Sequence, residues 1–214
     1  MSEQTEYELL ELARAGDQDA FEQLQMALEN PVRRFIRRLI GRSDVEDDIT
    51  QNAFFALYKN LGRLDEGAKL RPFLFRVVRN QCYDELRRQG RYDVVSLDDD
   101  VSGYSEDGDG GWSVAVASDA PPPDEATYWM MLFSEVQEAI QQLPELQRQT
   151  LLLYTEANLS YAEIADAMAV NIGTVKSRLH HAKRGLVRRL TPETCIALGV
   201  AVGDDQQQVA LNEV

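Results

Sequence analysis

The side chains best suited to chemistry gather near residue 180, and most of them are cations or hydrogen-bond donors. They are Lys176, Ser177, Arg178, His180, His181, Lys183 and Arg184. Lysine and arginine donate to phosphate oxygens and to guanine, and a serine hydroxyl can serve any base. The alternative is a charged helix face that only meets water. Residues 148–190 hold seven Lys/Arg against three Asp/Glu, and this local excess favours binding to DNA.

A second set of cationic and polar residues lies between residues 76 and 88. Its members are Arg76, Arg79, Asn80, Tyr83, Arg87 and Arg88. A single nucleic-acid strand is bound by cations along its backbone, by rings that stack on its bases and by donors for its base edges. The alternative places the aromatic residues of this segment in a core, and we expect this for Phe73 and Phe75. For Asn80, Arg87 and Arg88, DNA contact is what the family resemblance given below implies.

An acidic cluster opens another predicted helix, and it is expected to bind a protein partner. The residues concerned are Asp44, Glu46, Asp47, Asp48, Gln51 and Phe54. An acidic turn suits basic residues of a partner, and a neighbouring ring adds core or apolar contact. The acids would also stabilise the start of a helix through its dipole, with no partner involved. The two roles are compatible.

The sequence offers no set of residues for metal, cofactor or enzyme chemistry. His180 and His181 are the two histidines, and adjacent residues of a helix point about 100° apart. Cys82 and Cys195 are far apart and have no partner at metal-ligand spacing. A glycine-rich phosphate loop is also lacking. We therefore expect no catalytic residues, no metal ion and no cofactor.

These residues must be positioned by helices, because hydrophobic residues recur at spacings of three and four along most of the chain. One short helix begins near Tyr7 and ends at Gly16, and a second carries Phe21, Leu24 and Leu28. Further helices are expected over residues 32–41, 43–61, 71–91, 129–143, 144–157, 160–168 and 173–190. No stretch alternates strictly enough for a sheet, so the predicted fold class is all-α.

Several residues mark where these helices start. Pro31 is expected in the first turn of the third helix. The spacings of Ser43 and Glu46, and of Ser160 and Glu163, match capping boxes, in which side chains and end amides satisfy each other. The helix that starts at Ser43 is expected to bury Ile49, Phe54, Leu57 and Tyr58.

Residues 160–190 have the proportions of a helix-turn-helix, with a short helix to Met168, a connection over residues 169–172 and a longer second helix. The second helix of this motif enters the major groove of DNA. The residues expected on the inner stripes of the two helices are Ile164, Ala165, Met168, Val175, Leu179, Leu186 and Leu190.

The net charge of −14 is concentrated in the middle of the chain. Residues 93–147 contain 13 Asp/Glu and no Lys/Arg, so the acidic total does not exclude DNA binding elsewhere. Residues 93–128 are rich in Asp, Gly and Pro and are predicted to form a disordered, flexible acidic linker. This linker would join two small helical domains, residues 1–92 and residues 129–190.

The sequence predicts a cytoplasmic protein without membrane insertion. No apolar run approaches the roughly 20 residues that span a bilayer, and the acidic segment 1–12 does not look like a secretion signal. The lone cysteines fit a reducing compartment. In the tail, residues 191–214, Thr191 can cap one more short helix, and an apolar run over residues 195–202 suggests a regulatory role in masking DNA-binding surfaces.

Three segments of the second domain resemble region 4 of the sigma-70 family, and more narrowly its extracytoplasmic-function (ECF) group. They are Leu-Pro-Glu over residues 143–145, Leu-Ser-Tyr-Ala-Glu-Ile-Ala over residues 159–165 and Gly-Thr-Val-Lys-Ser-Arg-Leu over residues 173–179. The resemblance implies that this domain binds the −35 promoter element and the β flap of RNA polymerase. The residues nearest the bases would be Lys176, Ser177, His180 and His181.

The first domain resembles region 2 of the same family. Residues 44–54 look like region 2.2, which docks on the β′ clamp helices of core RNA polymerase, and residues 70–88 look like regions 2.3 and 2.4. The resemblance implies that residues 70–88 read the −10 element as a melted single strand, and that an anti-sigma factor is a further partner. It covers residues 6–92 and 129–190 and implies a factor that starts transcription at chosen promoters without catalysis of its own.

The main alternative is a stand-alone transcriptional regulator that uses the same helix-turn-helix. Such a protein would bind its DNA without polymerase, usually as a dimer, and the acidic cluster would then have no purpose.

Overall fold

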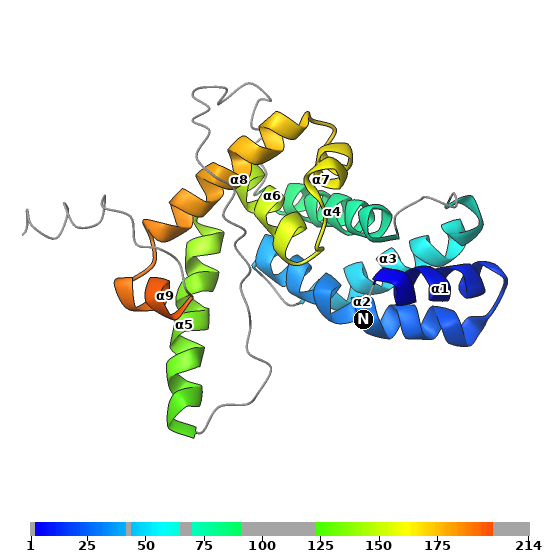
Figure 1. Cartoon of the computed structure of the whole chain (residues 1–214), viewed down its shortest axis with the longest axis horizontal. Coiled ribbons are helices and arrows are strands. Elements are labelled where there is room, and N and C mark those ends of the chain that lie inside the picture. Colours follow the sequence, from blue (N-terminus) through cyan, green and yellow to red (C-terminus); the bar gives the residue numbers. More distant parts are fainter. Residues whose placement is uncertain (1–2, 42–43, 65–69, 91–122, 199–214) are drawn as a thin grey trace, which may run out of the picture. The chain divides into compact units, whose positions relative to one another are not determined.

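The computed structural model of the chain describes residues 3–41, 44–64, 70–90 and 123–198 (Figure 1). Every regular element within these ranges is a helix, which confirms the predicted all-α fold class. The chain packs into two compact units. Of the described residues, the first unit contains those up to residue 90 together with residues 152–175, and the second contains residues 123–151 and 176–198.

The first unit is built around its longest helix. Its helices are α1 (Glu3–Arg14), α2 (Gln18–Ile40), α3 (Glu46–Asn60), the 3-10 turn η1 (Leu61–Arg63), α4 (Leu70–Arg88) and α7 (Tyr161–Met168). Helix α2 packs against α1, α3 and α4, and α4 also packs against α7. Phe35 of α2 and Phe75 of α4 meet edge to face in the core, with ring centroids 5.4 Å apart, and both are fully buried.

Helix α2 runs through Pro31 without a break, where the sequence predicted two helices. Asp17 caps its start by accepting from the amide of Ala20 at 3.1 Å, and Gly41 ends it with a left-handed φ of 74°. The proline removes one backbone hydrogen bond. The buried stripe continues in register across it, from Leu28 to Val32, so packing outweighs that loss.

Helix α3 differs from its prediction at the start and on one face. Its N-cap is Val45, which makes no side-chain capping bond, and Ser43 of the predicted capping box lies outside the described residues. The predicted burial of Ile49, Phe54 and Leu57 is confirmed. The predicted burial of Tyr58 is wrong, because its side chain is 51% exposed and only meets Phe21 edge to face at 5.2 Å.

Two nearly buried carboxylates outside α3 hold further elements of the first unit together. Glu6 accepts from Arg71 at the start of α4, at 2.8 Å and 2.5 Å. Glu156 accepts from Arg34 at 2.7 Å and also from Arg38, both on α2. A carboxylate with little access to water requires such cationic partners, so these pairs fix the elements that carry them.

The second unit contains α5 (Pro123–Gln141), residues 145–151 of α6 (Glu145–Thr155), α8 (Ile172–Val187) from Lys176 onward, and α9 (Pro192–Ala197). Helix α5 begins six residues before its predicted start at Trp129, so the end of the predicted linker is helical. The rest of that linker, up to residue 122, lies outside the described residues.

Helix α9 confirms the expected short helix after Thr191, and α5 holds it in place. The Glu135 carboxylate of α5 accepts from the backbone amide and the hydroxyl of Thr191 and from the hydroxyl of Thr194. Burial alone would raise the pKa of Glu135, but the donors from Thr194 and Thr191 outweigh it and lower that pKa. Thr194 and Cys195 are fully buried, so the start of the C-terminal tail is part of the packed unit.

Candidate partner-binding and nucleic-acid surfaces

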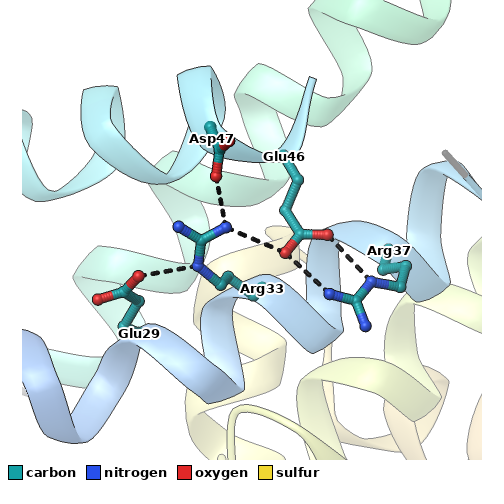
Figure 2. Close-up of polar contacts among 5 residues, drawn as sticks. All are labelled: Glu29, Arg33, Arg37, Glu46 and Asp47. Carbon is teal, nitrogen blue, oxygen red and sulfur yellow. Dashed lines mark hydrogen bonds and ion pairs between the residues drawn. The ribbon is translucent and has the colours of Figure 1, made fainter. Parts of the chain in front are cut away.

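The start of α3 is held by arginines of α2, while its N-cap residue Val45 makes no side-chain capping bond. Arg37 donates two hydrogen bonds of 3.0 Å to the carboxylate of Glu46, from Nε to Oε2 and from Nη2 to Oε1. Arg33 Nη1 adds a bond of 3.2 Å to Glu46 Oε1 and one of 2.6 Å to Asp47. Arg33 Nε donates to Glu29 at 2.8 Å, so this guanidinium joins three carboxylates (Figure 2). We call Glu29, Arg33, Arg37, Glu46 and Asp47 the α2–α3 ion cluster.

The carboxylate of Glu46 is inside the protein, since its side chain is only 5% exposed. Burial by itself would raise its pKa, but the bonds from Arg37 and Arg33 together outweigh burial, and the pKa lies below the ordinary carboxyl value. The bonds to Asp47, Glu29 and Glu46 raise the pKa of Arg33, and the bonds to Glu46 raise that of Arg37. Glu46 is therefore charged at neutral pH and serves as an internal counter-ion.

The outer face of α3 carries the residues that a partner can reach. They are Asp47, Asp48, Gln51, Asn52, Phe55, Tyr58 and Lys59. Their spacing places them on one side of a helix, with the acids at its start and Phe55 at its centre. The ammonium of Lys59 lies 4.2 Å from the centroid of the Phe55 ring. This side of α3 is an exposed surface with acidic and aromatic parts.

Two residues predicted at this surface have their side chains inside. Phe54 is only 3% exposed and Glu46 is bound by arginines, whereas Asp44, Asp47, Asp48 and Gln51 are exposed. The sequence left open whether Phe54, Phe55 and Leu57 form core or apolar surface, and of these three Phe55 is the exposed one, at 56%. The helical phase was the available signal, because Phe54 repeats with the buried Thr50 and Leu57 at spacings of four and three. That any of these residues binds polymerase stays a prediction.

Helix α4 presents the second predicted set mainly on one side. Arg76, Asn80 and Arg87, which follow one another at spacings of four and seven, are exposed, and so is Arg88. Arg87 lies 3.7 Å from Asp84, and Arg88 pairs with Glu85 at 2.5 Å. Both are pairs of neighbours on a helix, which bind weakly enough for an incoming phosphate to replace the acid.

The aromatic residues of α4 divide between core and surface. Phe75 is in the core, as expected, while Phe73 is half-buried with the guanidinium of Arg76 at 5.9 Å from its ring centroid. Tyr83 is 6% exposed, and the guanidinium of Arg79 lies 5.3 Å from its ring centroid. Arg79 also donates to the carbonyl of Ala167 at 3.3 Å. Stacking of a base on Tyr83 would require this arginine to move.

Helix α7 begins with the predicted capping box. The Ser160 amide donates to the Glu163 carboxylate at 2.8 Å, and the Glu163 amide donates back to the Ser160 hydroxyl at 3.4 Å. The helix ends at Met168, as predicted, and Ala169 turns the chain with a left-handed φ of 54°. Within this turn the amide of Val170 donates to the carbonyl of Ala165 at 2.9 Å.

Replacing Ser160 with Ala should lower the free energy of unfolding by about 1 kcal/mol, because the amide of Glu163 loses its acceptor. Urea unfolding followed by circular dichroism measures this. Ser160→Thr keeps the hydroxyl, which accepts from the Glu163 amide and donates to the Glu163 carboxylate, and should behave like the wild type. An equal loss in both variants would contradict the role of the cap.

Helix α8 starts with a cap that the sequence prediction did not recognise. Asn171 Oδ1 accepts from the amide of Thr174 at 2.7 Å and from its hydroxyl at 3.1 Å, so the helix begins at Ile172 rather than near Gly173. Asparagine is a favoured N-cap, and its position before Ile172 was the signal.

The side chains of α8 separate as the predicted stripes require. The predicted inner residues, from Ile164 to Leu190, are all buried. Lys176, His180 and Arg184 are exposed at spacings of four, and Ser177, Arg178, His181 and Lys183 are half-buried beside them. A helix with one buried and one cationic side is the form that enters a major groove. DNA contact by these residues stays a prediction.

The described residues include no group of three or more His, Cys, Asp or Glu placed to hold a metal ion. His180 and His181 meet each other edge to face at 5.6 Å. Burial raises the pKa of the Cys82 thiol, and burial followed by the charge of Glu135 raises that of Cys195, so both thiols are poor nucleophiles. Among the described helices, none is long and apolar enough to cross a membrane.

Known proteins resemble both the sequence and the fold of this chain. Residues 24–92 match the family model of Sigma-70 region 2, and residues 133–186 match that of Sigma-70, region 4. The ECF RNA polymerase sigma-E factor of Escherichia coli (strain K12) is 30% identical over 193 residues, which cover 90% of this chain and 98% of the relative. The ECF RNA polymerase sigma factor SigW of Bacillus subtilis (strain 168) is 29% identical over 183 residues, covering 83% and 92%.

Two solved structures share the fold. A chain in the structure of CnrH in complex with the cytosolic domain of CnrY has a TM-score of 0.59 and 20% identity, over 85% of this chain and 94% of that chain. A chain in the structure of the sigma factor RpoE in complex with the anti-sigma factor NepR from Bartonella quintana has a TM-score of 0.55 and 22% identity, over 78% and 94%. Because both family models match in order and a relative of 30% identity is covered almost from end to end, the chain belongs to the sigma-70 family, in its extracytoplasmic-function group.

Proposed function

We propose that this ECF sigma factor binds core RNA polymerase through the outer face of α3 and reads promoter DNA with α4 and α8. As a sigma factor it directs transcription initiation at chosen promoters. The observation that carries the assignment of surfaces is the division of side chains on these three helices. On each helix, polar and charged residues of the predicted sets remain exposed on one side, while the apolar residues of the opposite side are buried.

The proposed modules follow these surfaces rather than the compact units, since residues 152–175 pack with the first unit. Residues 1–92 form the module for polymerase and the −10 element, and residues 129–190 form the −35 module. The segment between them, 93–128, is proposed as the tether up to residue 122, since α5 begins at Pro123. A tether suits the task because the two elements lie apart on the DNA and each module must reach its own.

Helix α3 meets polymerase with acids at its start and Phe55 at its centre. Acids that face basic residues raise the rate and the selectivity of association, and a buried aromatic side chain contributes most to affinity. By resemblance the partner is the pair of β′ clamp helices, and the β flap is expected to receive the −35 module.

Helix α4 offers Arg76, Asn80, Arg87 and Arg88 to the single-stranded −10 element. Helix α8 offers Lys176, Ser177 and His180 to bases of the −35 element, with Arg184 and its neighbours at phosphates. The protein itself carries out no catalysis in this proposal, since bond formation belongs to the polymerase. It acts in the cytoplasm, where polymerase and DNA are found.

An anti-sigma factor is the further partner that we propose. Two structures of similar fold contain such a pairing, or a pairing with a cytosolic domain. A protein that covered the outer face of α3 would compete directly with polymerase.

Transcription in vitro with purified core polymerase, followed by mapping of the start sites, tests the function. We expect the protein to add start sites that core polymerase alone does not use. If it binds promoter DNA tightly without polymerase and gives no new start sites, the stand-alone regulator is the better description.

Replacing Lys176 with Ala should weaken binding to the −35 sequence. A base contact of this kind contributes about 1–3 kcal/mol, and the loss should depend on the sequence of the duplex. Fluorescence anisotropy with the promoter duplex and a scrambled duplex measures both effects. Arg14→Ala, on α1, is the control and should leave duplex binding unchanged. A uniform loss on both duplexes would assign Lys176 to a phosphate instead.

A further inference from the structure

The α2–α3 ion cluster lies directly behind the proposed polymerase surface. Glu46, Asp47 and Asp48 form the first turn of α3, yet their side chains have different surroundings. Glu46 is bound from behind by α2, Asp47 is shared with Arg33, and Asp48 is exposed with no ion pair to any residue that the structure describes. The first turn of α3 therefore carries both an inward carboxylate, Glu46, whose bonds to α2 we call the anchor, and an outward carboxylate, Asp48.

The anchor adds to the fixation of this helix start. The N-cap Val45 supplies no side-chain bond to the amides of the first turn. The first-turn acids could turn back to those amides, but Glu46 is directed to Arg33 and Arg37 instead. The start of α3 is therefore fixed by tertiary bonds to another helix.

Helix α2 is a rigid base for this anchor. Val32, Phe35 and Ile36 are fully buried on its inner side, between and beside the two arginines. Glu29, Arg33 and Arg37 follow at spacings of four along one outer row, and Glu29 orients Arg33 from one turn earlier (Figure 2). The arginine fork to a carboxylate has a fixed planar geometry, so it defines direction as well as distance.

We infer that Arg33 and Arg37 are positioning residues for polymerase binding, which act by holding Glu46 so that Asp48, Gln51 and Phe55 face the partner in a preformed arrangement. The inference rests on the proposed polymerase surface. Neither arginine needs to touch the polymerase. Without the anchor, the first turn of α3 must be ordered at the moment of binding, and affinity falls by the cost of that ordering.

The test compares isosteric and conservative variants in the full-length protein. Glu46→Gln keeps the shape of the side chain, removes its charge and leaves no buried charge behind. We expect its dissociation constant for core polymerase to rise roughly 5- to 30-fold, the factor that corresponds to ordering about one backbone residue. Arg37→Lys keeps the charge but loses the fork, and should lie between Glu46→Gln and the wild type.

A second measurement separates positioning from general stability. Amide hydrogen exchange should become faster at residues 49–52, whose amides are bonded to the first turn, in Glu46→Gln, while the second half of α3 and the core of α2 exchange as in the wild type. Binding is measured at a temperature where circular dichroism shows every variant folded. Arg14→Gln is the matched control, because it breaks the Arg14–Glu11 pair of 2.8 Å on α1 and should change neither measurement.

The outcomes distinguish a failure of the proposed function from a failure of the positioning role. If the wild type does not bind core polymerase, the proposed function fails. If the wild type binds and folded Glu46→Gln binds equally well, the positioning role is wrong while the proposed function stands. A loss of affinity that only follows the unfolded fraction, with unchanged exchange at residues 49–52, would also overturn the inference.

Discussion

Replacing Phe54 with Ala should lower the free energy of unfolding by about 3–5 kcal/mol, whereas the same change at Phe55 should alter it by less than about 0.5 kcal/mol. The two residues are neighbours with opposite surroundings, since Phe54 is 3% exposed and Phe55 is 56% exposed. The first change leaves a cavity in a packed core, and the second removes a ring that water already surrounds. Urea unfolding monitored by circular dichroism gives both values.

Binding to core polymerase should show the reverse order once both proteins are folded. Phe55→Ala should weaken binding about tenfold, because an exposed aromatic ring that becomes buried at an interface contributes on the order of 1–2 kcal/mol or more. Folded Phe54→Ala should bind nearly as the wild type does. If Phe55→Ala binds normally and Phe54→Ala does not, the outer face of α3 has been assigned incorrectly.

Removing both arginines around Glu46 should reverse the contribution of this carboxyl group to the pH dependence of stability. In the wild type the arginines hold the pKa of Glu46 below its ordinary value. A carboxyl group with a lowered pKa in the folded state contributes stability that is present above its unfolded pKa and is lost as the pH falls through the folded pKa. In Arg33→Met/Arg37→Met only burial acts on Glu46, so its pKa should rise, and acidification should then favour the folded state.

The double variant should lose about 2 kcal/mol of stability at pH 7. A fully enclosed carboxylate without its partner costs about 3–5 kcal/mol, and the cost is smaller here because Arg37 is 55% exposed and water can approach. Part of the loss should be recovered as the pH falls and Glu46 regains a proton. Unfolding free energies of the double variant and the wild type, measured over the same acidic range, test the sign.

Adding Glu46→Gln to the double variant provides the control. Without a buried charge, most of the lost stability should return at pH 7 and the reversed pH dependence should disappear. If the triple variant is as unstable as the double one, the packing of the arginine stems, and not the carboxylate, is responsible for the loss.

Local signals predicted much of the fold. The capping box at Ser160 and Glu163, the length of α7 and the buried stripe of α8 all follow from residues that are near one another in sequence. The all-α class followed in the same way. Motifs in both halves also predicted the sigma-70 family, which the family models and the relatives confirm.

Features that depend on packing were missed. Pro31 predicted a helix start, but the continuous buried stripe of α2 compensates for the lost hydrogen bond. Glu46 matched a capping box with Ser43, yet its partners are Arg33 and Arg37 on another helix. Such a pairing depends on how α2 and α3 cross, and no spacing within α3 indicates it.

The unbroken course of α2 has a consequence for how chain length can vary in this protein. One side of the helix faces the core while Arg33 and Arg37 face α3. Inserting or deleting a single residue before Glu29 would rotate one half of α2 by about 100° relative to the other half. Residues 18–28 and residues 29–40 would then no longer bury their apolar sides together. Length differences in natural variants are therefore expected between the helices, where an added residue leaves every stripe and every ion pair in place.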